Sequence, residues 1–168
     1  FHWHDAQRNP AQVGAELRAG DRLETGVHGK IKATLSDKSV VAIGAGTQLQ
    51  VSDLTVDDKG RTGRVKVAAG RFWMQITKWT GKGTSHYDVE TPNAVAGVRG
   101  TTLWGDSEVD AICALEGTIE VRSLVEPALT PAKLEPGKCA SELSHGKLAP
   151  FAPTPEQIEG YLSEVLIR

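Results

Sequence analysis

The chain has 168 residues, the usual size of one domain, and a chain of this length can bury enough surface to fold without a metal or a disulfide. Its 19 Lys and Arg residues against 21 Asp and Glu residues give a net charge of −2, which argues against nucleic-acid binding through an overall positive field. No apolar run reaches the ~18 residues of a membrane-spanning helix, and 39% hydrophobic with 24% charged residues is a globular composition.

The N-terminal end carries the first candidate site. His2-x-His4-Asp5 brings metal-ligand residue types together at a close spacing. Residues 1–12 are nevertheless predicted to form a flexible segment, because chain ends fray unless something holds them. We therefore favour a frayed end and predict no metal site. Because the chain begins at Phe1 rather than at methionine, we also expect an upstream segment such as a signal peptide, a membrane anchor or another domain.

Residues 13–123 are predicted to fold as an all-β domain of short antiparallel strands. The 18 glycines and 8 prolines favour frequent chain reversals. Residues 30–35 alternate polar and apolar side chains with a period of two, and the polar turn that follows leads into an apolar run, which together indicate a hairpin. Further strand candidates are residues 47–51, 64–68, 71–79, 85–90, 101–104, 109–115 and 118–122.

The C-terminal part has a different composition. Residues 124–148 are predicted to be a Pro-rich crossover with a final short strand around Cys139, and residues 149–168 a Pro-rich linker followed by a helix. Thr154 can cap this helix, Pro155 suits its first position, and Gln157 completes a capping box. A helix of this length is not stable alone, so its apolar stripe is expected to rest on the β body; a partner chain or another domain is the alternative.

Catalytic motifs are missing from the sequence. It contains no Gly-x-Ser-x-Gly, phosphate-binding loop or His-Glu-x-x-His, and His28, His86 and His145 are scattered singly. We therefore predict a protein that is not an enzyme and needs no cofactor. Cys113 and Cys139 form an even pair, which is compatible with a disulfide in an oxidising compartment and equally with two small buried thiols.

The strand predicted at residues 71–79 has one core face and one aromatic face. Alternation sends Phe72, Met74 and Ile76 into the core. The opposite face carries Trp73, Gln75, Thr77 and Trp79. Two tryptophans among polar residues are typical of a binding platform for a sugar or a protein edge. The interpretation that we favour is that the C-terminal helix or the Pro-rich segment covers them.

The segment from residue 87 to residue 102 is the densest constellation. Its motif residues are Thr91, Pro92, Gly97, Arg99, Gly100 and Thr101. Arg99 is one cation in an apolar stretch, where an unpaired guanidinium is very costly to bury. We favour a structural clamp over a ligand anchor, so Arg99→Ala is expected to cost several kcal/mol. The acidic partners considered for it are Asp21, Glu90 and Glu116.

In order along the chain, several segments resemble the FecR domain of bacterial iron-transport regulators. They are residues 14–26, 35–39, 43–49, 70–73, 89–101 and 116–121. The most distinctive is Val89-Glu90-Thr91-Pro92-Asn93-Ala94-Val95-Ala96-Gly97-Val98-Arg99-Gly100-Thr101. Residues 35–39 resemble the family's "L-x-D-G-S" turn, with Lys38 in place of the glycine. The likeness extends from about Val13 to Ser123.

The resemblance implies a β-solenoid- or sandwich-like domain that is periplasmic or secreted and acts by protein–protein contact. In the regulators, this half senses a signal from a TonB-dependent transporter and passes it through a membrane helix to a cytoplasmic anti-sigma segment. The partner would be an envelope protein, met through strand edges or the Trp73–Trp79 face. The alternative is a stand-alone secreted FecR-domain protein that binds carbohydrate or peptidoglycan through exposed tryptophans. A periplasmic location also favours the Cys113–Cys139 bridge.

Overall fold

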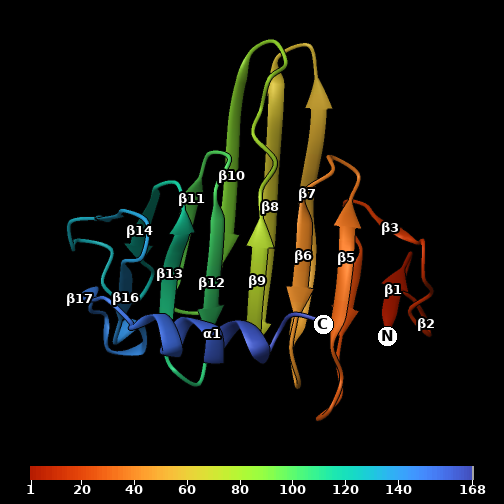
Figure 1. Ribbon diagram of the computed structural model, residues 1–168. Helices are drawn as coiled ribbons and strands as arrows, with labels where there is room; N and C mark the ends of the chain where they lie inside the picture. Colours follow the sequence, from red (N-terminus) through yellow and green to blue (C-terminus); the bar gives the residue numbers. More distant parts are fainter. Residues whose placement is uncertain (168) are drawn as a thin grey trace.

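The computed structural model describes residues 1–167, in which two β-sheets pack face to face and helix α1 (Pro155–Ser163) crosses the outer side of one of them (Figure 1). In spatial order, sheet A contains β15 (Ala132–Leu134), β14 (Ile119–Ser123), β11 (Ala94–Val98), β10 (Thr84–Glu90), β8 (Gly60–Ala69), β7 (Gln48–Asp57), β4 (Arg22–Glu24), β1 (His2–His4) and β2 (Gln7–Asn9). Sheet B contains β17 (Ala149–Phe151), β16 (Cys139–Ser141), β13 (Ala111–Glu116), β12 (Thr102–Asp106), β9 (Arg71–Gln75), β6 (Val40–Ile43), β5 (Ile31–Leu35) and β3 (Glu16–Leu17).

The predicted all-β, sandwich-like fold is confirmed. Most neighbouring strands are antiparallel, but β8 and β10 pair in parallel, as do β3 and β5. The β8–β10 pair is parallel because β9, which lies between them in the chain, belongs to the other sheet. Along the chain, single strands and pairs of consecutive strands alternate between the two sheets, so the chain encloses one core from both sides.

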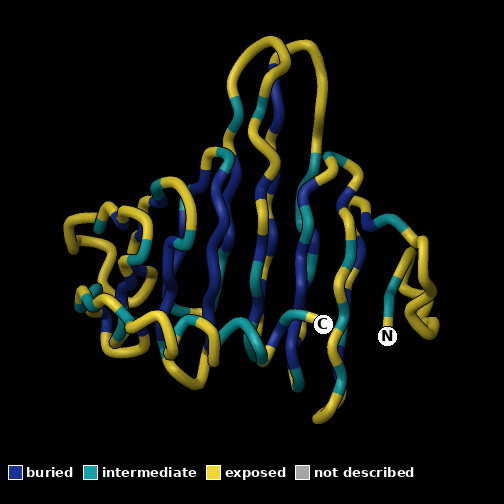
Figure 2. The backbone as a smooth tube through the Cα atoms, in the orientation of Figure 1, coloured by how far each residue is buried: buried dark blue, intermediate teal, exposed yellow. Residues whose placement is uncertain are grey.

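The core lies between the two sheets and follows the period-two pattern of the strands (Figure 2). In β9, Phe72 and Met74 are fully buried, as is Ile76 just beyond it, which confirms the predicted core face of this segment. In the hairpin of β5 and β6, Leu35 is buried and Ile31 and Ala33 pack partly buried against the same core.

Strands β7 and β8 extend well beyond the rest of the sandwich. Together with the start of β10 and the loop before it, they form a projection that we call the finger (residues 52–62 and 79–86; Figure 1). The sequence predicts shorter strands here, which end at residue 51 and begin again at residue 64, because residues 52–62 are mostly polar. Pairing along the whole hairpin, from Gln48–Ala69 to Asp57–Gly60, sustains the finger instead.

The turn at residues 36–38 forms with a lysine, not a glycine, at its left-handed position. Lys38 has φ 71°, in the left-handed region that glycine adopts most easily. The Asp37 carboxylate holds the turn by accepting hydrogen bonds from the Ser39 N–H and the Ser39 hydroxyl, at 3.0 and 2.9 Å. The Asp37 side chain is buried, so the same carboxylate also faces the interior of the molecule.

Helix α1 begins as the sequence predicts. The Thr154 hydroxyl accepts from the Gln157 N–H, and the Gln157 side chain accepts from the Thr154 N–H, so both halves of the capping box are present. Its apolar side packs on sheet B rather than on a partner, through Tyr161, Leu162 and, just beyond the helix, Val165.

Three boundaries differ from the expectations. Residues 1–12, expected to be flexible, contain β1 and β2, which pair with each other, and β1 also pairs with β4. Residues 149–151, expected to be linker, form β17 at the edge of sheet B, where Pro150 removes no needed hydrogen-bond donor. Strand β9 ends at Gln75 instead of Trp79, because the chain there leaves sheet B to enter sheet A.

Candidate functional site

A buried ion pair joins the two sheets at the base of the finger. The Arg61 guanidinium of β8 lies 3.1 Å from Asp37 Oδ2 of the β5–β6 turn, and both side chains are 1% exposed. The Nε and Nη2 atoms of Arg61 also donate to the Ser85 hydroxyl of β10, at 3.1 and 3.0 Å. One guanidinium thus fixes a turn of sheet B and two strands of sheet A.

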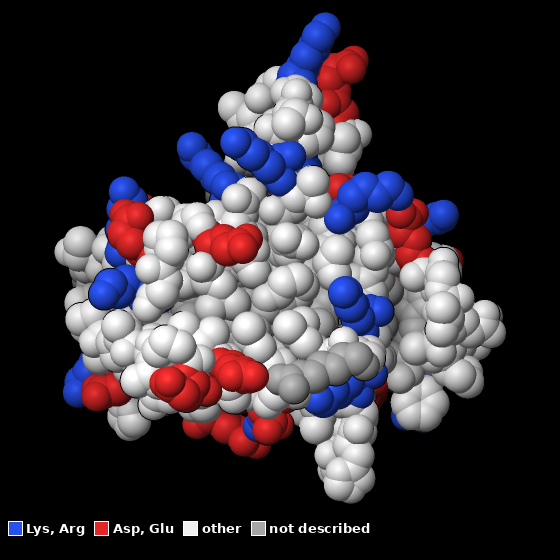
Figure 3. Space-filling view, viewed as in Figure 1, with Lys and Arg blue, Asp and Glu red and all other residues white. Residues whose placement is uncertain are grey.

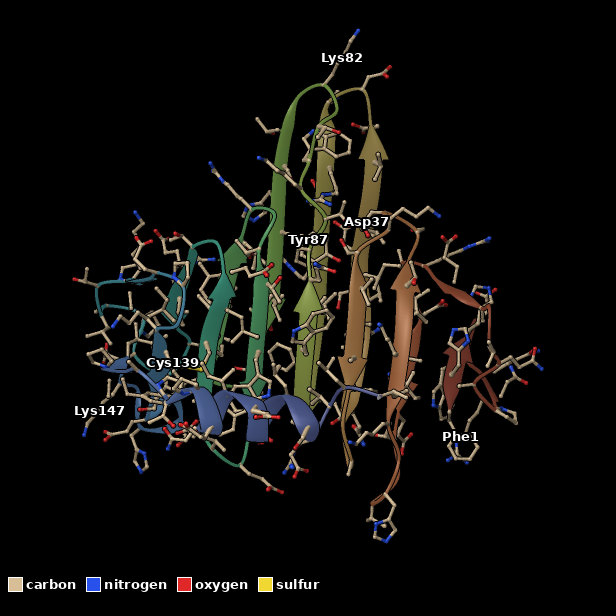
Figure 4. All side chains as sticks on the ribbon, viewed as in Figure 1. Phe1, Asp37, Lys82, Tyr87, Cys139 and Lys147 are labelled. Carbon is tan, nitrogen blue, oxygen red and sulfur yellow. A yellow bond between two sulfur atoms is a disulfide. The ribbon has the colours of Figure 1, made fainter. Side chains whose placement is uncertain are left out.

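Aromatic rings enclose this ion pair. The Arg61 guanidinium lies 5.5 Å from the ring centre of Tyr87 and 5.7 Å from that of Trp79. Tyr87 is fully buried, near Asp37 (Figure 4), and burial, reinforced by the Asp37 charge, raises the pKa of its hydroxyl. Its ring fills the space left by Gly63, since a Cβ at Gly63 would lie 2.2 Å from the ring. The finger is therefore braced from inside.

The outer face of sheet B carries one continuous row of residues beneath α1. Each is the direct cross-strand neighbour of the next: Ala42, Trp73, Trp104, Cys113, Cys139 and Phe151. Cys113 and Cys139 form a disulfide between adjacent strands, with Cα atoms 4.0 Å apart. The Tyr161 ring of α1 stacks on Trp104 with centroids 4.3 Å apart. This row is closed to large partners as long as α1 is in place.

Helix α1 is also held by charge. The Arg71 guanidinium reaches Glu164 just after the helix at 2.8 Å, Glu108 at 2.9 Å and Asp106 at 3.3 Å. Lys30 donates to the Ser163 carbonyl at 2.5 Å. In the face shown in Figure 3, acidic side chains lie along α1 and basic ones surround the base of the finger. Arg71 therefore pins the C-terminal end of the helix to sheet B.

The structure separates the residues proposed for an aromatic platform. Trp73 is half-buried in the cluster that α1 covers, and Gln75 is exposed at the end of β9. Trp79 lies beyond the strand, where its Nε1 donates to the Lys82 carbonyl at 3.2 Å within the finger. The common face of Trp73 and Trp79 does not form, because it required a strand that continues to residue 79.

Arg99 is not the buried clamp that its sequence context suggests. It lies in the turn after β11 and is exposed. In the described part of the chain, Arg99 has no ion pair and no side-chain hydrogen bond, and the three acids considered for it have other contacts. Asp21 binds His2 and His4, Glu90 lies 3.7 Å from Lys66, and Glu116 accepts from the Thr102 hydroxyl. The buried arginine is Arg61, so no unfolding follows from removing Arg99.

The other motif residues shape the two turns that flank β11. The Thr91 hydroxyl accepts from the Ala94 N–H at 3.1 Å and closes the β10–β11 turn, whose Pro92 is exposed. Gly100 has φ 62°, and a Cβ there would lie 2.9 Å from Lys78 Cα, so this turn requires glycine. Gly97 and Thr101 both line a groove on sheet A.

The outer face of sheet A is uncovered and charged. Its cross-strand neighbours include the pairs Arg64–Asp88 at 3.6 Å and Lys66–Glu90 at 3.7 Å. Arg64 and Lys66 are about half exposed, with side-chain exposures of 51% and 48%. No helix lies on this face in the described residues (Figure 1).

At the far edge of sheet A, a buried carboxylate holds the N-terminal strand. Asp21, 2% exposed, lies 3.1 Å from His2 Nε2 and 2.5 Å from His4 Nδ1. Its hydrogen bond with His4 raises the pKa of His4. Burial alone raises the pKa of Asp21, but hydrogen bonds from His4, the Arg18 N–H and His2 outweigh burial and lower it. Among residues 1–167 no group of three or more His, Cys, Asp or Glu side chains is arranged to hold a metal.

Arg61 and Arg71 were missed by the sequence reasoning, yet one signal for Arg61 existed. Counting back by twos from the apolar Val65 and Val67 leads through Gly63 to Arg61, so the strand alternation already places Arg61 on the core face. Arg71 gave no comparable signal, since its three carboxylates, Asp106, Glu108 and Glu164, all lie more than 30 residues away from it in the chain.

Together the fold and these contacts define a two-sheet β domain that is braced by a buried ion pair, a cross-strand disulfide and a C-terminal helix. A family model described as FecR protein matches residues 21–120, more than half of the chain, and the chain belongs to that family. Within residues 1–167 no helix has the length and hydropathy needed to cross a membrane.

Solved structures show the same fold. Two structures of a candidate anti-sigma factor from Parabacteroides distasonis ATCC 8503 align with 84% of this chain, each with a TM-score of 0.65, at 18% and 19% sequence identity. The alignment covers 64% and 63% of those chains, so this chain spans less than two thirds of their length. No curated protein matches the chain in sequence.

Proposed function

We propose that this domain is the extracytoplasmic sensing part of a sigma-factor regulator, which responds to a TonB-dependent transporter by protein–protein contact and without catalysis. Membership of the FecR family and a fold shared with a candidate anti-sigma factor support the regulatory role. The observation that carries the location is the Cys113–Cys139 disulfide, because disulfides rarely persist in the cytosol.

The geometry supports contact as the mode of action. The ion pair of Arg61 and Asp37, the disulfide and the Arg71 contacts all stiffen the body, so a partner meets preformed surfaces. Helix α1 occupies the outer face of sheet B, whereas the finger and the outer face of sheet A remain open. A rigid body with one open face binds without a large ordering cost.

The test uses the full-length natural protein in its own bacterium. Deletion of residues 21–120 is expected to change the transcription of genes that depend on one extracytoplasmic sigma factor, as measured by RNA sequencing. Val27→Ala, at an exposed loop position, is the control and is expected to leave transcription unchanged. A deletion strain with an unaltered transcript profile would contradict the proposal.

A further inference from the structure

Gly97 occupies a position where the fold does not require glycine. It lies in β11, between β10 and β14, outside the left-handed region, and a Cβ there would meet nothing closer than 3.8 Å. Glycine weakens the interior of a strand and often marks a place where another backbone approaches closely. The folded structure therefore does not explain why this position has no side chain, and a binding partner that approaches Gly97 closely would explain it.

That absence interrupts a row of charged side chains. Across the outer face of sheet A, the direct neighbours in register are Arg64, Asp88, Gly97, Glu120 and Lys133. The gap opens into a groove of about 570 Å³, which runs from Gly97 past the Arg99–Gly100 turn to Gly117. This volume lies in the range of ligand sites.

Two buried polar atoms at this groove have no hydrogen-bond partner. Asp88 is 5% exposed, and its Oδ1 lies 3.9 Å from where a Gly97 Cβ would be; only its Oδ2 is used, by His86 and Arg64. Thr101, also 5% exposed, lines the groove, and its hydroxyl is unpartnered as well. Leaving such buried atoms unpaired costs free energy, which a ligand with matching groups recovers.

The groove offers an acidic ligand one cation that has no ion-pair partner among residues 1–167. Arg99 and Lys133 line it together with Glu120, and the Asp88 carboxylate beside Gly97 is paired with Arg64 at 3.6 Å. Lys133 has Glu135 as a partner at 3.4 Å, whereas Arg99 has no ion-pair partner in the described part of the chain. No Trp, Tyr or Phe side chain is among the described residues that line the groove, so a sugar would find no ring to stack on.

We propose that this groove, the Gly97 groove, binds an extended acidic peptide segment of the partner protein. The peptide main chain crosses the gap at Gly97, where one of its N–H groups donates to Asp88 Oδ1 once the exposed His86 side chain turns aside. A peptide carboxylate pairs with the Arg99 guanidinium, and the Thr101 hydroxyl donates to a peptide carbonyl. This inference rests on the proposed function and gives the contact surface its location.

The direct test is a titration of the ¹⁵N-labelled domain followed by NMR. The probe is a peptide of alternating Glu and Thr, about ten residues long, so that it spans the groove as a strand. Shift changes confined to residues 86–88, 97–101, 117–120 and 133 are expected, with none from a Lys–Thr peptide of equal length. Absence of shifts with the acidic peptide, equal shifts with both peptides, or shifts elsewhere would overturn the proposal.

Variants separate the groove from the fold. Gly97→Val fills the gap with a residue that strands favour, so it is expected to fold with an unchanged or higher Tm and to bind the acidic peptide at least about ten-fold more weakly. Arg99→Glu is expected to do the same, and Arg122→Glu, exposed on the same face outside the groove, serves as the charge control. An unfolded Gly97→Val protein would show that the fold needs this glycine and would remove the premise.

Transcription measurements in the bacterium then distinguish the two proposals. If deletion of residues 21–120 alters transcription and Gly97→Val in the full-length protein does not, the proposal that the groove binds the partner is wrong and the proposed regulatory function stands. If the purified domain binds the peptide at the groove and the deletion has no effect on transcription, the proposed regulatory function is wrong and peptide binding at the groove is upheld.

Discussion

The two outer faces of this sandwich are built in opposite ways. On sheet B, a row that includes Trp73, Trp104 and the Cys113–Cys139 disulfide is covered by α1. On sheet A, the corresponding row is charged, interrupted by Gly97 and open to solvent. The outer face of sheet B thus stabilises the fold through burial, whereas the outer face of sheet A contributes little to stability.

This difference indicates where changes are tolerated. Burial of large apolar rings and the constraint of a disulfide each contribute a few kcal/mol to the free energy of unfolding. Exposed ion pairs such as Arg64–Asp88 contribute about 0–1 kcal/mol. A surface that contributes little to folding can change its side chains to suit a partner, and we expect the binding residues there.

The largest effect is expected at the ion pair that joins the two sheets. Arg61→Ala leaves the Asp37 carboxylate buried without its cation, and the loss is about 3–5 kcal/mol in the free energy of unfolding. Chemical denaturation measures it. In the double variant Arg61→Ala/Asp37→Ala the loss should be smaller than the sum of the two single losses, because the unpaired charge is gone. A single-variant loss below about 1 kcal/mol would mean that the sheets are not held together here.

The covered face is tested by its disulfide. Cys113→Ser/Cys139→Ser removes a link between residues 26 apart in sequence, which in the chain-entropy model lowers the free energy of unfolding by about 3–4 kcal/mol. Thermal unfolding of the variant and of the reduced wild-type protein should agree. Titration of two free thiols in the denatured, unreduced wild-type protein would refute the bridge.

The helix is tested by its stacked ring. Tyr161→Ala removes the stack on Trp104 and is expected to cost about 1–2 kcal/mol. Hydrogen exchange in residues 155–163 should accelerate more than exchange in the strands, and Trp104 fluorescence should shift to the red as water reaches it. Tyr161→Phe keeps the ring and should resemble wild type. Uniform acceleration across both sheets would show that α1 and the body unfold as one unit.

The sequence predicted what depends on neighbouring residues. The capping box of Thr154 and Gln157 is confirmed, as are the buried Phe72 and Met74, because each follows from a short local pattern. Sequence reasoning was wrong about Arg99, since the choice between a buried strand position and an exposed turn depends on where β11 ends. That end is set by pairing with β14 across more than 20 residues, which no local pattern reports.

The candidate site was less accessible to sequence reasoning than the fold. Trp73 and Trp79 are close in sequence but belong to different parts of the molecule, whereas Arg61 and Asp37 are 24 residues apart and touch. The gap at Gly97 becomes visible only when the strands are placed in register. Contacts between sheets decide all of these positions, and a single sequence carries little information about them.

A pH-dependent effect is expected at the edge of sheet A. The raised pKa of His4 means that its contribution is present below the ordinary value of 6.5 and is lost as pH rises through the folded-state pKa. The lowered pKa of Asp21 means that its contribution is present above 3.8 and is lost as pH falls through the folded-state pKa. Strands β1 and β2 should therefore be most protected from hydrogen exchange in mildly acidic solution, between these two limits.

The control for this effect is His4→Gln, which keeps a hydrogen-bond donor without titrating near neutral pH. In this variant the protection of β1 and β2, corrected for the intrinsic pH dependence of exchange, should no longer fall as pH rises. It should still fall at acidic pH, where Asp21 becomes protonated. Equal pH profiles for wild type and His4→Gln would remove His4 from the account.

The smallest effect is expected on the open face of sheet A. Arg64→Ala breaks the contact with Asp88, but Arg64 is half exposed and His86 still reaches the same carboxylate, at 3.2 Å. The free energy of unfolding should therefore change by less than about 0.5 kcal/mol, within the range of ordinary surface substitutions. High salt should abolish even that difference, because surface pairs are screened. If Arg64→Ala were instead as damaging as Tyr161→Ala, the charged face would be part of the folding framework, and its residues could no longer be regarded as free for a partner.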